Sequence, residues 1–95
     1  MPMYLMLTKL TFEGRKTIKK LPERILGVDA EFEKMGIKVL DQYALLGPYD
    51  FLNILEAPNN EAIAKISVEF GSRGTIEIVT LPAITVEEFI GKMGT

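Results

Sequence analysis

Two short runs of β-branched, aromatic and aliphatic residues occupy the middle of the chain, at residues 37–45 and 51–56. Between them, residues 47–50 read Gly-Pro-Tyr-Asp and supply three residue types that favour turns. Two such runs joined by a short turn segment are typical of a β-hairpin. The pattern therefore predicts a hairpin over residues 37–56, around which the rest of the chain is arranged.

The N-terminal third predicts a strand followed by a helix. Residues 3–10 are apolar at both alternating sets of positions until Lys9, as in a strand covered on both sides. Thr11 can cap the next helix, and Glu13 in its first turn lies next to the positive end of the helix dipole. The apolar positions then recur at helical spacings of three and four residues: Ile18, Leu21, Ile25, Val28, Phe32 and Met35.

Pro22 interrupts this helical stripe. Because the residue before a proline avoids helical backbone angles, we expect a break near Lys20 and Leu21. Pro22 is then expected to start a second, longer helical segment, since proline is tolerated in the first turn of a helix. Gly36 follows the last apolar position and can adopt the left-handed conformation that ends many helices.

The C-terminal half predicts a helix, a strand and a helical turn. Asn60 is expected to cap a helix over residues 61–70. The apolar positions of this helix share one side: Ile63, Ile66 and Phe70. The fourth strand covers residues 75–81 and is expected to end at Pro82. Thr85, with a glutamate three positions later, has the spacing of a capping box and predicts a short helical turn.

The resulting order is a βαββαβ unit of the α+β class, folded as a single domain over residues 1–95. Two helices can cover only one face of a four-stranded sheet, so the other face should be polar in a monomer. The strands are instead apolar at both sets of positions, and the simplest cover for the second face is the same sheet of another copy. The pattern therefore predicts a homodimer or a higher homo-oligomer.

Composition narrows the class of protein. Of the 95 residues, 47% are apolar, but no apolar run approaches the roughly 20 residues of a bilayer helix. No signal peptide is visible, so we expect a cytoplasmic protein without membrane association. The net charge of −2 provides no general attraction to nucleic acid. Because the chain has no Cys and no His, we expect no metal and no cofactor.

The chain resembles the GYD domain family over nearly its whole length. The similarity lies in these segments: residues 4–11, 22–24, 47–50, 56–58, 71–75 and 80–89. The resemblance implies a ferredoxin-like unit of the dimeric α+β barrel group, with an antiparallel four-stranded sheet and two helices on one face. It also implies a family whose biochemical function is not established. The hairpin is similar to that of the ligand-sensing domain of leucine-responsive transcription regulators, where small effectors bind at subunit interfaces.

The hairpin loop holds the first candidate site residues. Asp50 can anchor the amine of a ligand or act as a base, or it can accept backbone N–H bonds and shape the loop. Gly47 is expected to supply a backbone angle that other residues avoid, and Pro48 to stiffen the turn. Tyr49 can hydrogen-bond a ligand or lie in an interface with its hydroxyl outward.

Three polar residues outside the loop are further candidates. Asn53 and Gln42 lie within apolar strands and need partners, either in a site between sheet and helices or across a dimer interface. Arg73 can reach a carboxylate ligand or pair with an acid of a partner subunit. For the basic residues of the first helical stretch we favour a solvated face over an anion-binding face: Arg15, Lys16, Lys19, Lys20 and Arg24.

These residues are compatible with three functions. The leading interpretation is a module that binds a small molecule in the sheet–helix cleft or at a subunit interface. Its site is formed by Gly47, Tyr49, Asp50, Asn53 and Arg73, and it needs no catalytic residue. The first alternative is a cofactor-free enzyme of the dimeric α+β barrel type with Asp50 as the base. The second alternative is a purely structural subunit of an assembly.

Overall fold

The computed structural model describes residues 1–94, and for residues 24–26 it describes the backbone alone. Four strands form one sheet: β1 (Met3–Leu10), β2 (Lys38–Ala44), β3 (Phe51–Glu56) and β4 (Ile76–Ala83). The helices of the described residues are α1 (Phe12–Lys20), α2 (Arg24–Lys34), α3 (Asn60–Gly71) and α4 (Val86–Met93). This order confirms the predicted α+β class, with α4 added at the end of the βαββαβ unit.

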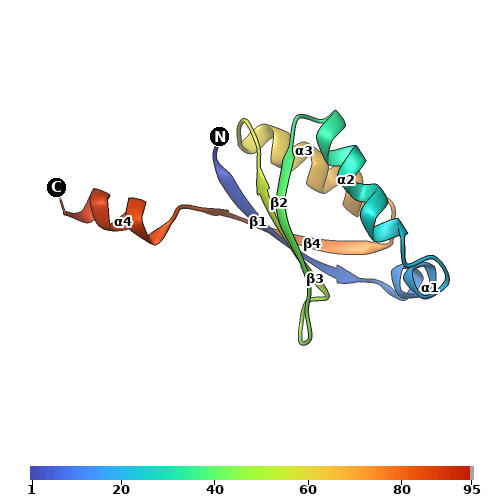
Figure 1. Ribbon diagram of the computed structural model, residues 1–95. Coiled ribbons are helices and arrows are strands. Elements are labelled where there is room, and N and C mark those ends of the chain that lie inside the picture. Colours follow the sequence, from blue (N-terminus) through green and yellow to red (C-terminus); the bar gives the residue numbers. More distant parts are fainter. Residues whose placement is uncertain (95) are drawn as a thin grey trace.

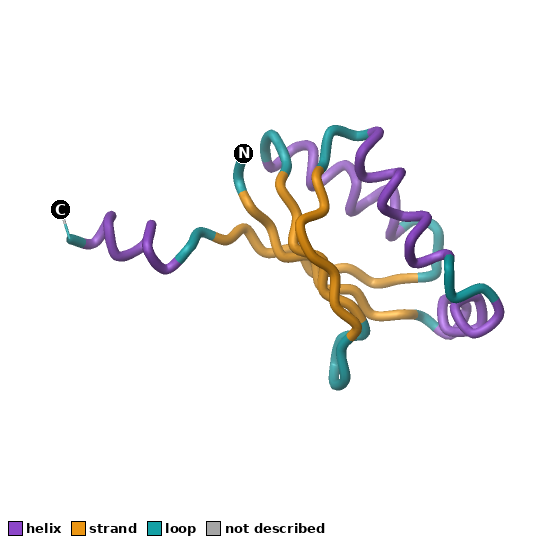
Figure 2. Tube along the Cα trace, viewed as in Figure 1, coloured by secondary structure: helices purple, strands orange, loops and turns teal. Residues whose placement is uncertain are grey.

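All neighbouring strands of the sheet are antiparallel, in the order β2-β3-β1-β4. The two strands that begin each half of the unit, β1 and β3, are therefore central, and β2 and β4 are the edges. Helices α2 and α3 lie against one face of this twisted sheet, and the opposite face carries no helix of the body (Figures 1 and 2). The arrangement is the predicted ferredoxin-like fold.

The core fills the space between the sheet and these two helices. Its largest fully buried side chains come from the two central strands, from α2 and α3, and from the residue that precedes β2: Tyr4, Met6, Phe32, Ile37, Leu55 and Ile66. The rings of Phe32 and Phe70 meet edge to face with their centroids 5.1 Å apart, which joins the two helices directly. Burial of each such side chain stabilises the fold by roughly 1.5–3 kcal/mol.

The break predicted in the first helical stretch is confirmed. Helix α1 ends at Lys20, and α2 begins at Arg24 rather than at the predicted Pro22, because residues 22–23 form a turn. Leu21 lies at this break and is exposed, so it leaves the apolar stripe, whereas Phe32 is fully buried. The side chains of Arg24 and Ile25, predicted for the basic face and the stripe, lie outside the described residues.

Two predicted element ends are wrong. The cap of α3 is Asn59, whose side chain accepts the Ala62 amide, while Asn60 accepts a hydrogen bond from the hydroxyl of Tyr4. Pro82 does not end the fourth strand, because it pairs with Tyr4 inside β4. Proline lacks the N–H that an inner strand needs, but an edge strand tolerates it where the missing donor faces away from the sheet.

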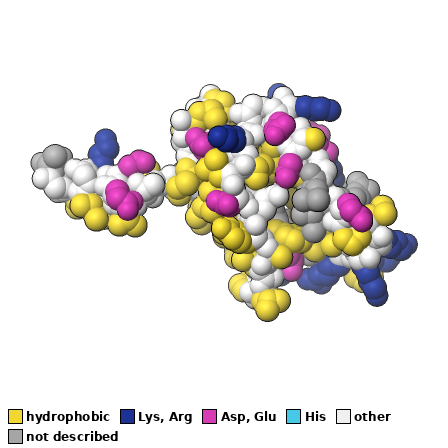
Figure 3. Space-filling model, in the orientation of Figure 1, with side chains coloured by type: hydrophobic (Ala, Val, Ile, Leu, Met, Phe, Trp, Pro, Cys, Tyr) yellow, Lys and Arg dark blue, Asp and Glu magenta, His cyan; other side chains and the backbone are white. Residues whose placement is uncertain are grey.

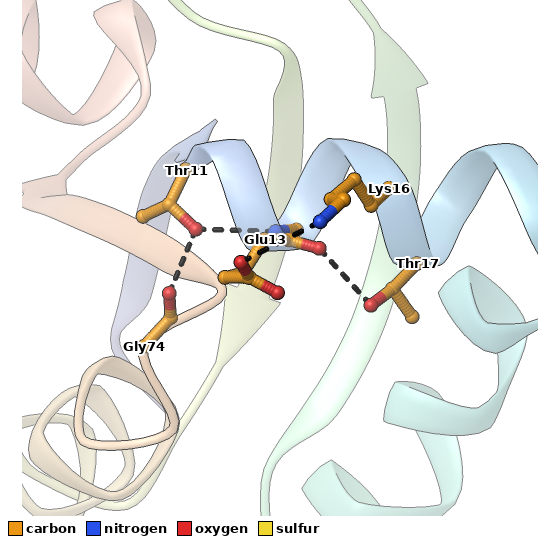
Figure 4. A network of polar contacts seen from close by, with 6 residues as sticks. Thr11, Glu13, Lys16, Thr17 and Gly74 are labelled. Atoms are coloured by element: carbon orange, nitrogen blue, oxygen red, sulfur yellow. Dashed lines mark hydrogen bonds and ion pairs between the residues drawn. The ribbon is translucent and has the colours of Figure 1, made fainter.

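The predicted Thr11 cap forms a junction between distant segments (Figure 4). The Thr11 side chain accepts the Gly14 amide and donates to the carbonyl of Gly74 at 2.7 Å, and the Thr11 amide donates to the carbonyl of Thr75. Gly14 is buried at this junction, and a Cβ added to it would lie 2.0 Å from the Thr75 oxygen. Only glycine allows α1 to approach the start of β4 this closely.

The sheet is apolar on both faces, as the strand pattern predicts. The face towards the helices carries the buried residues of β1 and β3. The opposite face, which we name the open face, is partly exposed. Its apolar part is formed by Leu5, Leu7, Tyr43, Leu52, Ile54, Val79 and Leu81, and the same face also carries Lys9, Asp41, Glu56 and Glu77. Of these side chains, Tyr43, Val79 and Leu81 are 40–51% exposed.

Asp50 attaches the β2–β3 hairpin to the end of β1. Its carboxylate oxygen Oδ2 accepts the Leu10 amide at 2.7 Å, and its own amide donates to the Thr8 carbonyl at 2.8 Å. Its carbonyl accepts the Leu45 amide, which closes the loop. The interpretation in which Asp50 accepts a backbone N–H bond and shapes the loop is confirmed.

The Thr11 junction generates a stability prediction for Gly14→Ala. The added methyl group meets a backbone oxygen that cannot move away, so we expect the free energy of unfolding to fall by ~1–3 kcal/mol in urea denaturation. Gly27→Ala is the matched control, because it lies in α2 with open space around the added Cβ. Helix propensity alone should leave that variant unchanged or more stable by up to ~1 kcal/mol. Equal effects of the two substitutions would contradict the close approach.

Asp50 generates a second stability prediction. Asp50→Ala removes the acceptor of the Leu10 amide and is expected to lower the free energy of unfolding by ~1–3 kcal/mol. Asp50→Asn keeps an oxygen at the same place and should recover part of that loss. Chemical denaturation of both variants beside the wild type measures the difference. An alanine variant as stable as the wild type would show that the bond contributes nothing to the fold.

Candidate functional site

A cavity of about 810 Å³ lies between the sheet and helices α1, α2 and α3. Its walls are mostly apolar, with Met6 from β1 and the aromatic pair Phe32 and Phe70 among them. Polar and charged side chains also line it, among them Thr8, Glu31, Gln42, Asn53 and Arg73. An apolar cavity with a few convergent polar groups is the usual form of a small-molecule site.

Asn53 and Gln42 form a polar chain on the helix side of the sheet. The Gln42 Nε2 atom donates to Oδ1 of Asn53 at 3.1 Å and to Oδ1 of Asp29 on α2 at 2.8 Å. Asn53 is only 9% exposed, so this bond satisfies a group that would be costly to bury alone. Both amides face the helices and not the open face, which places them in the sheet–helix cleft rather than across a sheet-to-sheet interface.

Arg73 lies at the rim of the same cavity, in the loop after α3. Its Nη1 atom is 2.7 Å from Oε2 of Glu31 on α2, and its Nη2 atom is 3.7 Å from Glu69. The buried Glu31 Oε2 is held by the charge of the guanidinium rather than by a well-aligned hydrogen bond. The guanidinium also stacks 4.8 Å from the ring centroid of Phe70. Arg73 thus joins α2 to α3 within its own chain.

The loop residues Gly47, Tyr49 and Asp50 lie apart from the cavity, which none of them lines. Gly47 has the predicted positive φ, at 120°, which other residues rarely adopt. Its neighbour Leu46 is fully exposed at the loop, and the hairpin projects beyond the body of the sheet (Figure 1). Tyr49 is half-buried beside Asp50. The five predicted site residues therefore separate into a group in the hairpin loop and a group at the cavity.

Two residues of these sites were not among the predicted ones. Leu46 directly follows an apolar strand, so the sequence pattern predicts that it is the last buried residue of that strand. Only the geometry of the turn shows that it is exposed. Glu31 lies on α2, and its pairing with Arg73 depends on how α2 and α3 pack, which no local pattern shows. The basic residues Arg15, Lys16, Lys19 and Lys20 are exposed, as expected for a solvated face.

Two classes of site do not occur in the described residues. Residues 1–94 contain no group of three or more acidic side chains placed to hold a metal ion. None of the helices in that part of the chain is long and apolar enough to cross a membrane.

A family model and a relative both match almost the whole of this chain. The family model described as the GYD domain matches residues 4–92. A protein of Thermus thermophilus named glutamine synthetase and cystathionine beta-lyase binding protein is 42% identical over 94 residues, covering 98% of this chain and 99% of that protein. No solved structure matches the chain. Because the family model spans almost all of the chain and the relative is similar over its full length, this protein belongs to the GYD domain family.

Proposed function

We propose that this protein binds other proteins, and specifically enzymes such as glutamine synthetase and cystathionine β-lyase of its own organism. The observation that carries the proposal is the 42% identity to a Thermus protein named for binding these two enzymes, over nearly the whole of both chains. Because the alignment covers 99% of the relative, nearly every position of its binding surface has an aligned position in this chain. A protein-binding role replaces the small-molecule module as the first hypothesis.

The β2–β3 hairpin is the proposed contact with the enzyme. Leu46 presents a fully exposed apolar side chain, and the loop beneath it is held by the positive φ of Gly47 and by the Asp50 bonds. A rigid loop loses little conformational entropy on binding, so an exposed leucine on it can act as an anchor. In this proposal Gly47, Tyr49 and Asp50 shape a protein-binding loop rather than a ligand pocket.

The proposed molecule is a homodimer through the open face. Seven apolar side chains of four strands lie on that face without a covering helix of the body, which supports burial against a second copy. Two sheets pack about 10 Å apart with their strands nearly aligned. The hairpins of both copies then project from the paired sheets and remain free to contact an enzyme.

A second candidate function is binding of a small molecule in the sheet–helix cavity. The observation that favours it is the meeting of Asn53 and Arg73 in one cavity of about 810 Å³. The apolar walls fit a hydrophobic body, and the amides of Gln42 and Asn53 fit a carbonyl or hydroxyl group. Such a ligand can act as an effector of the protein-binding function.

Leu46→Ser tests the proposed enzyme contact. We expect the dissociation constant for immobilised glutamine synthetase or cystathionine β-lyase, measured by biolayer interferometry, to rise ~10-fold or more. The matched control is Val68→Ser, an exposed apolar residue on α3 away from the hairpin, which should bind as the wild type does. Equal binding by both variants would exclude the hairpin as the contact. A wild-type protein that binds neither enzyme would refute the proposed function itself.

Native mass spectrometry of the purified protein tests the cavity. We expect a discrete extra mass on the wild-type chain, and we expect Asn53→Leu to lose it because the amide that orients the ligand is gone. Asp41→Asn is the control, an exposed position on β2 outside the cavity, and should keep the extra mass. This second function would be contradicted if the wild-type protein had the mass of the chain alone and if no compound in a panel of small metabolites raised its melting temperature.

A further inference from the structure

Helix α4 projects from the body of the molecule at the end of β4 (Figure 1). Thr85 caps it by accepting the Glu88 amide, as predicted. Its apolar residues follow helical spacing and lie along one side of the projecting segment (Figure 3): Val86, Phe89, Ile90 and Met93. Each of these four side chains is 54–71% exposed, and no residue of α4 is buried.

An isolated helix of this length is not stable on its own. Helix α4 has eight residues, whereas isolated helices shorter than about 12–15 residues are marginal in water. Its amphipathic side must therefore pack on another surface for the helix to persist. The body of its own chain does not provide that surface, since α4 points away from the sheet and from the helix layer (Figure 1).

We infer that α4 is an exchanged arm, whose apolar side packs on the second copy in the dimer formed through the open face. The inference rests on the pairing of open faces proposed above and adds a second element to it. In a two-fold dimer the contact occurs twice, so one association provides a surface for both arms. The same contact covers apolar side chains that neither chain covers alone.

The exposed apolar area of α4 supports a second copy of the chain as the surface on which α4 packs. A stable interface buries about 800 Å² on each partner. The four side chains of α4 and the neighbouring Ile84 expose more than half of their surface, and they supply part of that area. The open face has mostly half-buried side chains and supplies the remainder. Sheet face and arm together reach the area that a stable dimer needs.

The charges of α4 argue against a membrane as the surface on which this helix packs. Helices that lie on membrane surfaces are rich in Lys and Arg on their polar side. Here the first turn carries Glu87 and Glu88 and the last turn carries Lys92, so the helix is acidic on balance and an anionic lipid surface repels it.

The first test is the double substitution Phe89→Glu with Ile90→Glu, studied by sedimentation equilibrium. We expect the wild type to have twice the chain mass of 10.6 kDa and the variant to dissociate with a constant raised ~100-fold or more. Glu87→Gln on the polar side of α4 is the control and should dimerise as the wild type does. Both side chains are exposed within the chain, so circular dichroism should show the variant still folded.

The second test places the arm on its partner. Because the chain has no cysteine, Gly91→Cys provides one spin-label site, and open space surrounds the added side chain. The spin-labelled protein is mixed with ¹⁵N-enriched wild-type protein that carries no spin label. We expect paramagnetic broadening of open-face amides such as those of Leu5 and Leu81 in the unlabelled chain.

The outcomes separate the arm from the dimer. A wild-type mass of one chain would overturn both the paired open faces and the exchanged arm. A dimer without intermolecular broadening, or one that the Phe89→Glu, Ile90→Glu variant leaves equally tight, would overturn the arm alone. If that variant stays dimeric but loses enzyme binding, α4 is an enzyme contact and the inference is wrong.

Discussion

The structure depends on a mismatch between a sheet that is apolar on both faces and helices that cover one of them. Helices α2 and α3 bury Tyr4, Met6 and Leu55 on the inner face. On the open face Leu5, Leu7 and their neighbours keep part of their surface in contact with solvent. At roughly 25 cal/mol per Å², an uncovered face of this kind favours association strongly. The proposed homodimer and the exchanged arm would both cover these exposed apolar side chains.

Within one chain, separate polar contacts hold separate parts of the fold in place. The Thr11 junction joins α1 to the start of β4, the Asp50 carboxylate joins the hairpin to β1, and Arg73 joins α2 to α3. None of these contacts lies on the open face. The open face and the hairpin loop are therefore positioned by polar contacts that lie elsewhere in the chain.

The sequence predicted the elements well, because periodicity and caps are local: the strand over residues 51–56 and the Thr11 and Thr85 caps are confirmed. It failed where the outcome depends on neighbours. Pro82 is tolerated only because β4 is an edge, and Glu31 meets Arg73 only because α2 packs beside α3. The candidate residues lie partly in the hairpin loop and partly at the cavity, and this division also depends on how the elements pack. Whether a loop faces inward or outward is decided by packing.

The proline within β4 also limits how the protein can assemble. Because residue 82 has no amide hydrogen, another strand cannot add to that edge through a complete ladder. At the other edge, β2 has an irregular register between Val39 and Asp41, which disturbs the regular spacing that strand addition requires. Growth of the sheet sideways into a filament is therefore disfavoured at both ends.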